Sequence, residues 1–331
     1  MAALRRTAFL LEREQAQTYR VKAFRSAAAV LSKLPRGELD RRLAAGTLQE
    51  LSGIGKVTAA VAAEAAQGRT PAYLQELEDL APPDVEGAEP LLSALRGDLH
   101  VHSDWSDGGS PIDEMATTAA GLGHEYVALT DHSARLRVAN GLDRDRRLQQ
   151  LDVVDDLNAR LAPFRILTGI EVDILDDGSL DCDDDILERL DVVVASVHSK
   201  LRMPESQMTP RMVAAIANPH TDVLGHCTGR MVVGKRRPES LFDAALVFEA
   251  CRQFAVAVEV NCRPERLDPP RRLLRQAVEA GCSFSVDTDA HAPGQLAWQP
   301  YGAVRAAECG VTADRVVNTL PVDQLLAWTH R

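Results

Sequence analysis

The sequence predicts an α/β protein in which a parallel sheet with helical crossovers follows a small helical domain. Residues 1–80 are alanine-rich, show helical spacing and contain no convincing strand. Beyond Gly97, short apolar runs alternate with helical stretches such as 111–123 and 269–281. Parallel strands need such crossovers, so the alternation favours a barrel or a doubly wound sheet. Seven runs are candidate strands: 97–102, 126–132, 165–172, 191–199, 222–227, 255–261 and 283–291.

The composition is that of an ordinary folded, soluble chain. Hydrophobic residues make up 45% and charged residues 26% of 331 positions. No apolar run approaches the ~20 residues needed to span a bilayer, and the N-terminal apolar stretch is too short and too soon charged for a signal peptide. The six cysteines are scattered without a CxxC pair, so neither a disulfide framework nor a zinc ribbon is indicated. We therefore expect a cytoplasmic protein with free thiols and no membrane partner.

Charge divides the chain into two parts. Residues 1–80 hold 12 Lys and Arg against 9 Asp and Glu, whereas the remainder holds 25 against 39. The basic part suits a phosphate backbone. Within it, Gly53 and Gly55 form a turn before a helix predicted over 56–66, and Lys56 adds a positive charge. Bare N–H groups at a helix start form an anion site, although a tight helix–helix connection needs glycine equally.

Each predicted strand ends in polar residues that can bind metal ions. In a β/α barrel the C-terminal ends of the strands build the active site, and six of the nine histidines stand at such ends. His100 and His102 would share one strand face, although an isolated pair equally fits a polar strand end. The residues at or just beyond these ends are His100, His102, Asp107, Asp131, His132, Glu171, His198, His226, Glu259, Asn261, Asp289 and His291.

This set of side chains predicts a multinuclear metal site. Imidazole and carboxylate without thiolate suit zinc, manganese or iron rather than calcium or magnesium alone. The ligands outnumber what one ion needs, so two or three divalent ions are expected. Such sites stabilise both the attacking and the leaving oxygen of a phosphoryl displacement and make hydroxide available near neutral pH. The predicted chemistry is therefore hydrolysis of a phosphate ester.

Six stretches in order, DLHVHS, TDHS, GIEVDIL, VASVHS, LGHCTGR and TDAH, resemble the motifs of the PHP (polymerase and histidinol phosphatase) superfamily. The resemblance runs from about residue 96 to the C-terminus and implies a distorted seven-stranded (β/α)7 barrel with a three-metal centre. SVHSKLRM and EVNCRPERLD make the chain most similar to the PHP domain of bacterial family X DNA polymerases. TYRVKAFRSAAAVLSKLP and LSGIGKVTAAVAAEAAQGRTP resemble the helix–hairpin–helix domain of the same polymerases.

The resemblance implies a domain organisation and two departures from the family pattern. We expect a DNA-binding helix–hairpin–helix domain over 1–80, a proline-containing linker over 81–95 and a PHP phosphoesterase domain over 96–331. The linker has no room for a polymerase palm, so DNA synthesis is not expected. Cys227 stands where the family favours proline.

The same resemblance assigns roles to individual residues. One metal would take His100, His102, Glu171 and Asp289, a second would share Glu171 and add His198 and His226, and a third would take Asp107, His132 and His291. These nine residues would form the catalytic set, with Asp98 and Asp131 either orienting imidazoles or forming hydrogen bonds at strand ends. Lys200 and Arg230, and less strongly Arg202 and Arg263, would bind the substrate phosphate. Gly53, Gly55 and Lys56 would bind DNA, whereas His124, His220 and His330 are expected to be ordinary packing or surface residues.

We therefore expect a metal-dependent phosphoesterase that acts on DNA ends in repair, as a 3′-5′ exonuclease or a 3′-end processing enzyme. Its helical domain would contact the DNA backbone without reading sequence, and a separate polymerase or ligase is a candidate partner. A small-molecule phosphatase of the histidinol-phosphatase type is the alternative. A non-catalytic DNA-binding module is a third hypothesis, against which the filled ligand positions argue. The acidic run 176–185 lacks EF-hand spacing and is expected to be a solvated loop.

Overall fold

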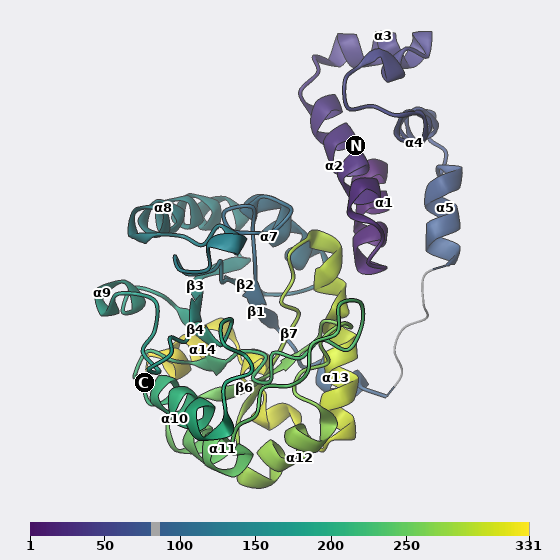
Figure 1. Ribbon diagram of the computed structural model, residues 1–331. Helices are drawn as coiled ribbons and strands as arrows, with labels where there is room; N and C mark the ends of the chain where they lie inside the picture. Colours follow the sequence, from purple (N-terminus) through teal and green to yellow (C-terminus); the bar gives the residue numbers. More distant parts are fainter. Residues whose placement is uncertain (81–86, 331) are drawn as a thin grey trace. The chain divides into compact units, whose positions relative to one another are not determined.

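A computed structural model describes residues 1–80 and 87–330, which fall into two compact units, Met1–Asp84 and Val85–Arg331 (Figure 1). Residues 81–86 of the predicted linker lie outside the described residues. The rest of that segment contains the short helix α6 (Glu89–Leu92), whose Leu91 is buried in the core of the larger unit. The second half of the predicted linker is therefore packed against the larger unit.

The smaller unit is built from helices that share one apolar core. Leu4, Leu11, Phe24 and Ile54 belong to this core, and Phe24 stacks on Tyr73 with ring centroids 5.6 Å apart. The predicted helix over 56–66 is present at those residues. The elements are α1 (Ala2–Arg13), α2 (Thr18–Ser32), α3 (Arg36–Ala45), the 3₁₀ turn Leu48–Glu50, α4 (Lys56–Ala66) and α5 (Ala72–Asp79).

The larger unit contains a seven-stranded parallel sheet in which each strand pairs with the next along the chain, so that the strands form a nearly closed barrel. The predicted barrel is thereby confirmed over a doubly wound sheet, which would reverse its strand order. Most strand residues are buried, as expected for a parallel sheet covered by helices. The strands are β1 (Gly97–Val101), β2 (Tyr126–Leu129), β3 (Arg165–Asp173), β4 (Val192–Ser196), β5 (Val223–Leu224), β6 (Ala257–Asn261) and β7 (Phe284–Asp287).

Helices connect the strands and surround the barrel (Figure 1). The predicted helical stretches 111–123 and 269–281 contain α7 and α12. The connecting and C-terminal helices are α7 (Ile112–Gly121), α8 (Arg144–Leu161), α9 (Asp184–Leu187), α10 (Glu205–Ile216), α11 (Ala244–Gln253), α12 (Arg271–Ala280), α13 (Gln299–Glu308) and α14 (Val322–Thr329).

Side chains complete the seam between β1 and β7. The backbone joins the two sides at the bridge between Val101 and Ala290. Nearby, the backbone N–H of Leu99 donates to Asp287 Oδ1 at 2.8 Å, and the Thr288 hydroxyl donates to Asp98. Buried carboxylates thus replace part of a backbone ladder where the barrel closes.

Asn318, from the segment before α14, strengthens the same seam. Its Oδ1 atom accepts from the N–H of Val286 at 3.1 Å, and its Nδ2 donates to the carbonyls of Gly97 and Val286, both at 2.9 Å. One amide therefore bonds to backbone groups of both β1 and β7, and Gln299 Nε2 donates to the same two carbonyls at 2.9 and 3.0 Å.

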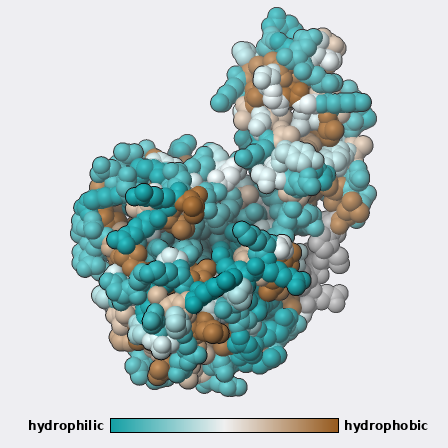
Figure 2. Space-filling view, in the orientation of Figure 1, coloured by the Kyte–Doolittle hydropathy of each residue, from teal (hydrophilic) through white to brown (hydrophobic). Residues whose placement is uncertain are grey.

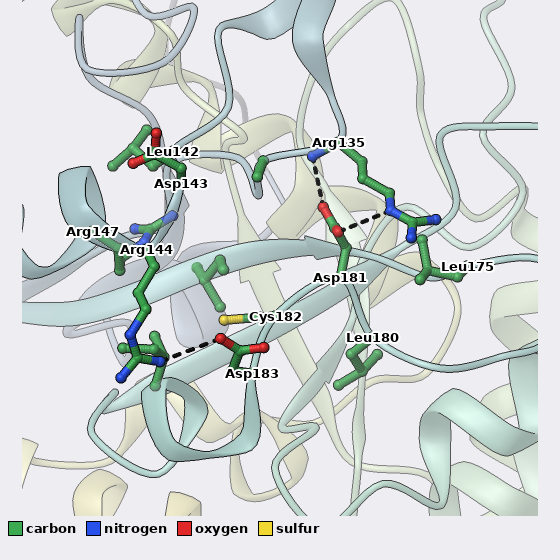
Figure 3. Close-up of a pocket in the computed structure, with 13 residues that line it drawn as sticks. Arg135, Leu142, Asp143, Arg144, Arg147, Leu175, Leu180, Asp181, Cys182 and Asp183 are labelled. Atoms are coloured by element: carbon green, nitrogen blue, oxygen red, sulfur yellow. Dashed lines mark hydrogen bonds and ion pairs between the residues drawn. The ribbon is translucent and has the colours of Figure 1, made fainter.

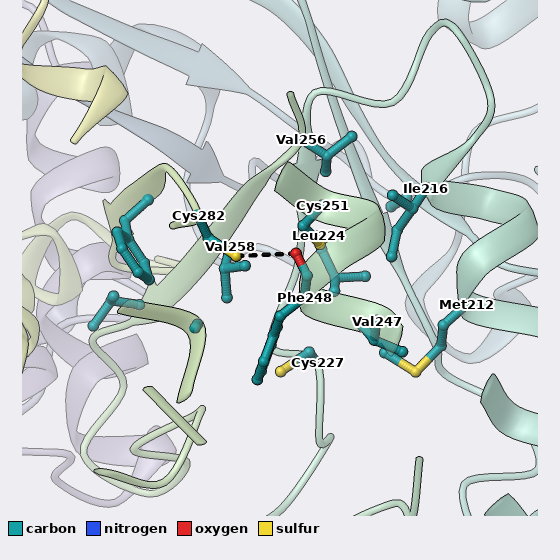
Figure 4. Close-up of a cluster of buried hydrophobic side chains, with 14 of the residues drawn as sticks. Met212, Ile216, Leu224, Cys227, Val247, Phe248, Cys251, Val256, Val258 and Cys282 are labelled. Atoms are coloured by element: carbon teal, nitrogen blue, oxygen red, sulfur yellow. Dashed lines mark hydrogen bonds between the residues drawn. The ribbon is translucent and has the colours of Figure 1, made fainter. Parts of the chain in front are cut away.

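Three cysteines are part of the hydrophobic core between the sheet and α10–α11. Cys227, Cys251 and Cys282 are buried around Phe248, and the Cys282 thiol donates to the Phe248 carbonyl at 3.2 Å (Figure 4). Burial raises the pKa of Cys227 and Cys251 well above the usual thiol value. Cys227, which replaces the family's proline, is thus a small apolar core residue.

Hydrophilic residues dominate the surface in Figure 2, and hydrophobic side chains are scattered between them. Exposed large apolar residues include Val138, Leu241 and Leu246. Among the described residues, no helix is both long and apolar enough to cross a membrane.

Phe248→Ala should destabilise the larger unit by about 3–5 kcal/mol, because it opens a cavity at a fully buried position of the core. The free energy of unfolding, measured by urea titration, checks this. Phe254→Ala, at a position 47% exposed beside the same helix, is the matched control and should change that free energy by less than about 0.5 kcal/mol. Equal effects of the two substitutions would contradict the assignment of the core.

Candidate metal centre

The nine residues predicted as ligands lie together at the C-terminal ends of the barrel strands. The carboxylate of Glu171, on β3, is at the middle of this group and is almost completely buried. Five imidazoles surround it. Glu171 Oε2 lies 3.3 Å from His100 Nε2, 3.5 Å from His102 Nε2 and 2.9 Å from His132 Nδ1, and Glu171 Oε1 lies 3.1 Å from His198 Nε2 and 2.8 Å from His226 Nε2.

Two further carboxylates complete the cluster. Asp107 Oδ1 lies 3.5 Å from His132 Nε2 and 3.3 Å from His291 Nε2, and the His102 and His291 rings are 4.2 Å apart. Asp289 Oδ1 lies 3.5 Å from His102 Nε2. The structure thus brings all nine predicted ligands into one cluster.

Two members of the cluster have unusual backbone conformations. Asp289 adopts φ +53° and His226 adopts φ +20°, values that non-glycine residues rarely take. Gly225, just before His226, packs so tightly that an added Cβ would lie 2.2 Å from Ser196 Oγ. The backbone is therefore held in strained conformations at two strand ends, as is frequent at functional sites.

The charges of the cluster are strongly coupled. Burial disfavours the charged form of Glu171, but the imidazoles of His198, His100 and His132 outweigh it and hold the Glu171 pKa well below its usual value. Burial likewise lowers the pKa of His198, yet the Glu171 carboxylate raises it to about 9. Burial and the neighbouring His291 and His132 lower the pKa of His102. His102 is therefore neutral, the form in which imidazole binds metals.

The donor atoms fit divalent metal ions. Within residues 1–80 and 87–330, several buried atoms of the cluster have no hydrogen-bond partner: His100 Nε2, both ring nitrogens of His102, His132 Nδ1, His198 Nδ1, His226 Nδ1 and Glu171 Oε2. Unpaired buried polar atoms are costly, and metal ions would satisfy them. Three overlapping groups have donor atoms close enough to share an ion, so the cluster fits more than one metal: His102, Asp107, His132 and His291; His100, His102 and Glu171; His132, Glu171 and His198.

The acids that lie against the imidazoles are not the ones that the sequence suggested. Glu259 Oε1 lies 2.6 Å from His100 Nδ1, and Asp173 Oδ1 lies 3.5 Å from His198 Nδ1. Neither residue was predicted in this role. A sequence signal existed for both, because Glu259 is an acid within the apolar run of β6 and Asp173 follows Glu171 on the same strand face.

Asp98 and Asp131 were expected either to orient imidazoles or to form hydrogen bonds at strand ends, and the structure shows the second: they contact backbone, hydroxyl and amide groups. Asp98 closes the seam to β7, and burial raises its pKa to about 7. Asp131 accepts from the backbone N–H and the hydroxyl of Ser103 at 2.8 and 2.6 Å and from Gln150 Nε2 at 2.6 Å. Both carboxylates therefore position the loops that carry histidines, and they touch none of the rings.

Arg147, on α8, holds the His132 segment from behind. Its guanidinium donates to the carbonyls of Gly169 at 2.9 Å, Asp131 at 2.7 Å and His132 at 3.3 Å. The side chain is almost completely buried, and burial lowers its pKa to about 10. It thereby joins the end of β2 to β3.

The residues predicted to bind phosphate lie in different surroundings. Lys200 is 63% exposed and pairs with Asp176. Arg230 donates Nε to the carbonyl of Arg266 at 3.0 Å and Nη1 to Glu239 at 3.3 Å. Arg202 is exposed, beside Lys200 in the loop after β4.

Arg263 lies closer to the metal-ligand cluster than the other predicted phosphate-binding residues. Its Nη1 is 3.1 Å from His291 Nδ1, and its Nη2 donates to Glu265 at 2.8 Å.

The acidic run 176–185 is largely exposed, as expected for a solvated loop, and some of its carboxylates also accept hydrogen bonds from neighbouring loops. Asp181 accepts from the backbone N–H of Arg135 at 2.7 Å, and Asp185 accepts from Arg144 at 2.8 Å. These contacts border a pocket of about 320 Å³ between the loops after β2 and β3 (Figure 3). None of the nine cluster residues is among those that line this pocket.

The predicted DNA-binding turn is an exposed element of the smaller unit. Gly53, Gly55 and Lys56 are exposed, whereas Ile54 between them is buried and anchors the turn. Gly53 adopts φ +86°, which glycine favours. The hydroxyl of Thr58 accepts from the Gly55 N–H at 2.9 Å, and the following N–H groups begin α4. This end of α4 presents a positive dipole end beside the Lys56 charge.

A seven-stranded β/α barrel with buried imidazoles and carboxylates at its C-terminal rim is an arrangement suited to binding metal ions. The model of the PHP domain family matches residues 98–253, and the helix-hairpin-helix domain model matches residues 1–70. The chain belongs to the PHP family and is a hydrolase acting on phosphate ester bonds.

Known proteins resemble the chain over different lengths. The DNA polymerase/3′-5′ exonuclease PolX of Bacillus subtilis is 40% identical over 240 residues, which cover 72% of this chain and 42% of that protein. The chain thus spans less than half of that relative. A probable phosphatase of Acetivibrio thermocellus is 30% identical over 203 residues, 59% of this chain and 78% of that protein. A histidinol phosphate phosphatase structure from Lactococcus lactis, complexed with zinc, L-histidinol and phosphate, aligns with a TM-score of 0.49 and 17% identity. The alignment covers 65% of this chain and 94% of that chain.

Zinc or manganese at about 1,000 times its dissociation constant should stabilise the metal-free protein by about 4 kcal/mol. Calorimetric melting checks this. The Glu171→Gln variant should lose most of this stabilisation by metal, because the substitution removes the central carboxylate. The His220→Ala variant, changed outside the cluster, should retain the stabilisation. Since His198 is protonated below a pKa of about 9, metal affinity should rise from pH 6 to pH 9. Melting unaffected by metals would contradict the assignment.

Proposed function

We propose that the chain is a metal-dependent phosphoesterase that acts on DNA ends, as a 3′-5′ exonuclease or a 3′-end processing enzyme in repair. The observation that supports this most strongly is the combination in one chain of the buried nine-residue cluster and the exposed turn of Gly53, Gly55 and Lys56. A metabolite phosphatase has no evident need for a domain suited to a phosphate backbone. The polymerase/exonuclease named for the Bacillus relative supports the same substrate class.

The proposed metal assignment follows three groups. His100, His102, Glu171 and Asp289 would hold one ion, Glu171, His198 and His226 a second, and Asp107, His132 and His291 a third, as zinc, manganese or iron. When bound, such ions supply a nucleophile at neutral pH and neutralise charge on the phosphoryl group.

The chain's own residues position the imidazoles and exclude water from the cluster. Glu259 accepts from His100 Nδ1–H and so presents Nε2 toward the cluster, and Asp173 accepts from the backbone N–H of His198 at 3.2 Å, which fixes the position of that residue. Arg147 fixes the end of β2, from which His132 projects. The burial of Glu171 keeps the cluster in a low-dielectric setting, where electrostatic interactions are stronger than in water.

The smaller unit would bind the DNA backbone without reading sequence. The N–H groups at the start of α4 and the Lys56 ammonium match phosphate oxygens, and neither distinguishes bases. A separate polymerase or ligase would act on the ends that this enzyme prepares.

The alternative is a small-molecule phosphatase that uses the same cluster. It is supported by probable phosphatases such as that of Thermoanaerobacter sp. strain X514, which is 28% identical over 233 residues and is covered to 89% of its length. The match covers 67% of this chain, and the small helical unit is the feature on which we separate the two proposals.

Manganese-supplemented protein should release label from 3′-labelled single-stranded or gapped DNA. His132→Ala should abolish this release because it removes a proposed ligand, and His220→Ala should leave it intact. Histidinol phosphate is assayed in parallel. Turnover of histidinol phosphate alone would favour the small-molecule phosphatase over DNA-end processing.

Lys56→Ala should weaken DNA binding and reduce the slope of log affinity against log salt by about 1, because one phosphate contact is lost. Hydrolysis of p-nitrophenyl phosphate should be unchanged. Arg69→Ala, beyond the other end of α4, is the matched control and should bind DNA normally. Fluorescence anisotropy at several salt concentrations provides the measurement. Loss of small-ester hydrolysis in Lys56→Ala would contradict the division of labour between the two units.

A further inference from the structure

Four arginines gather on the side of the rim formed by the loops after β5 and β6. Arg230 and Arg237 come from the first loop, and Arg263 and Arg266 come from the second. Arg266 is among the charges that act on the pKa of Arg237, and Arg230 contacts the Arg266 carbonyl. This concentration of positive charge lies next to the proposed ligands Asp289 and His226.

Three of the four guanidinium groups have hydrogen-bond partners within the protein. Arg230 donates to the carbonyls of Arg266 and Leu267 and to Glu239. Arg237 Nε donates to the Gly229 carbonyl at 2.5 Å. The partners of Arg263 are Glu265, the Asp289 carbonyl and His291 Nδ1.

Arg266 differs from the other three. Its Nε lies 3.2 Å from Asp289 Oδ2, and its side chain is 15% exposed. Its Nε and Nη1 are buried and form no hydrogen bond with any residue of 1–80 or 87–330. Its charge also acts on His226, whose pKa is lowered first by burial and then by Arg266. The guanidinium therefore pairs with Asp289 of the cluster through Nε and has a buried Nη1 without an acceptor.

The turn that carries Arg266 is rigidly held. Besides Arg230, the guanidinium of Arg305 donates to the Leu267 carbonyl at 2.6 Å. Asp268 accepts from the Thr228 hydroxyl at 2.6 Å and from the Arg230 N–H at 3.3 Å. Leu267 adopts φ +49°, so the backbone is constrained as well. The Arg266 side chain thus starts from a preorganised position.

Electrostatics indicates what this side chain binds. With divalent ions in the cluster, the Asp289 carboxylate would be shared between those ions and Arg266, and Nη1 of Arg266 would still lack an acceptor. A non-bridging phosphoryl oxygen that binds the ions would accept from this Nη1–H group in a charge-assisted hydrogen bond.

We propose that Arg266 binds the phosphoryl group of the substrate, and that Arg230 positions Arg266 from behind and does not itself contact substrate. The inference rests on the proposed function only in that the substrate is a phosphate ester. It holds equally for a DNA end and for a small ester. It replaces the assignment of Lys200 and Arg230 made from the sequence, because Lys200 is largely exposed and Arg230 is occupied by backbone carbonyls.

The test measures binding of inorganic phosphate to metal-loaded protein by calorimetry, together with hydrolysis of p-nitrophenyl phosphate. Arg266→Ala should weaken phosphate binding and lower kcat/KM about 100-fold, the usual loss for one donor to a reacting oxyanion. Its metal content and melting temperature should equal those of the wild type. Arg266→Lys should recover part of the loss, since it restores the charge without the forked donors.

Two further variants separate binding from positioning. Arg230→Ala should weaken phosphate binding and also lower the melting temperature, because it leaves the carbonyls of residues 266 and 267 without this partner. Arg271→Ala, on α12 and paired with Glu308 at the surface, should behave as the wild type.

Unchanged phosphate binding in Arg266→Ala, or a loss that simply follows a loss of metal, would overturn the proposal. Phosphate binding is measured independently of turnover. If the enzyme failed to cleave DNA, the DNA-end function would therefore be refuted, and phosphate binding would still test the role of Arg266.

Discussion

The carboxylate of Glu171 lies within 3.5 Å of nitrogens of five imidazoles that come from four other loops or strands, and the geometry of the rim depends on it. A buried carboxylate among buried imidazoles is stable only when charges and donors balance. The imidazoles keep Glu171 ionised, and Glu171 in turn raises the pKa of His198. Metal ions would take the place of the protons in this arrangement.

A second set of polar residues keeps the strand ends in place around Glu171. Asp98 and Asp287 join β1 to β7, Asp131 and Arg147 hold the loops around His132, and Glu259 holds His100. These groups lie behind the rim and form hydrogen bonds with backbone as well as side chains. The precision of the cluster therefore comes from buried polar contacts between strands that are distant in sequence, since β1 and β7 are separated by nearly the whole barrel.

Much of the barrel was predictable because each strand is a short apolar run that ends in a histidine or an acid. The helix over 56–66 was predictable because Gly53 and Gly55 end the preceding turn. The roles of Glu259 and Asp173 were missed, since an acid in a strand does not reveal which imidazole it meets. Asp98 and Asp131 were placed next to histidines in the sequence, but their carboxylates turn toward Thr288, Ser103 and Gln150.

The sequence by itself indicated the fold class and the polar residues at the strand ends, because periodicity and residue type are local properties, and the resemblance of its motifs to the PHP superfamily indicated the family and the nine residues of the cluster. Only the tertiary structure decided which side chains meet. It showed that Glu171 is shared by five imidazoles, that the acidic run 176–185 anchors loops, and that Arg230 is occupied while Arg266 has free donors. Such distinctions depend on where a guanidinium finds its hydrogen-bond acceptors, and those acceptors are backbone carbonyls whose positions are fixed only when the barrel closes.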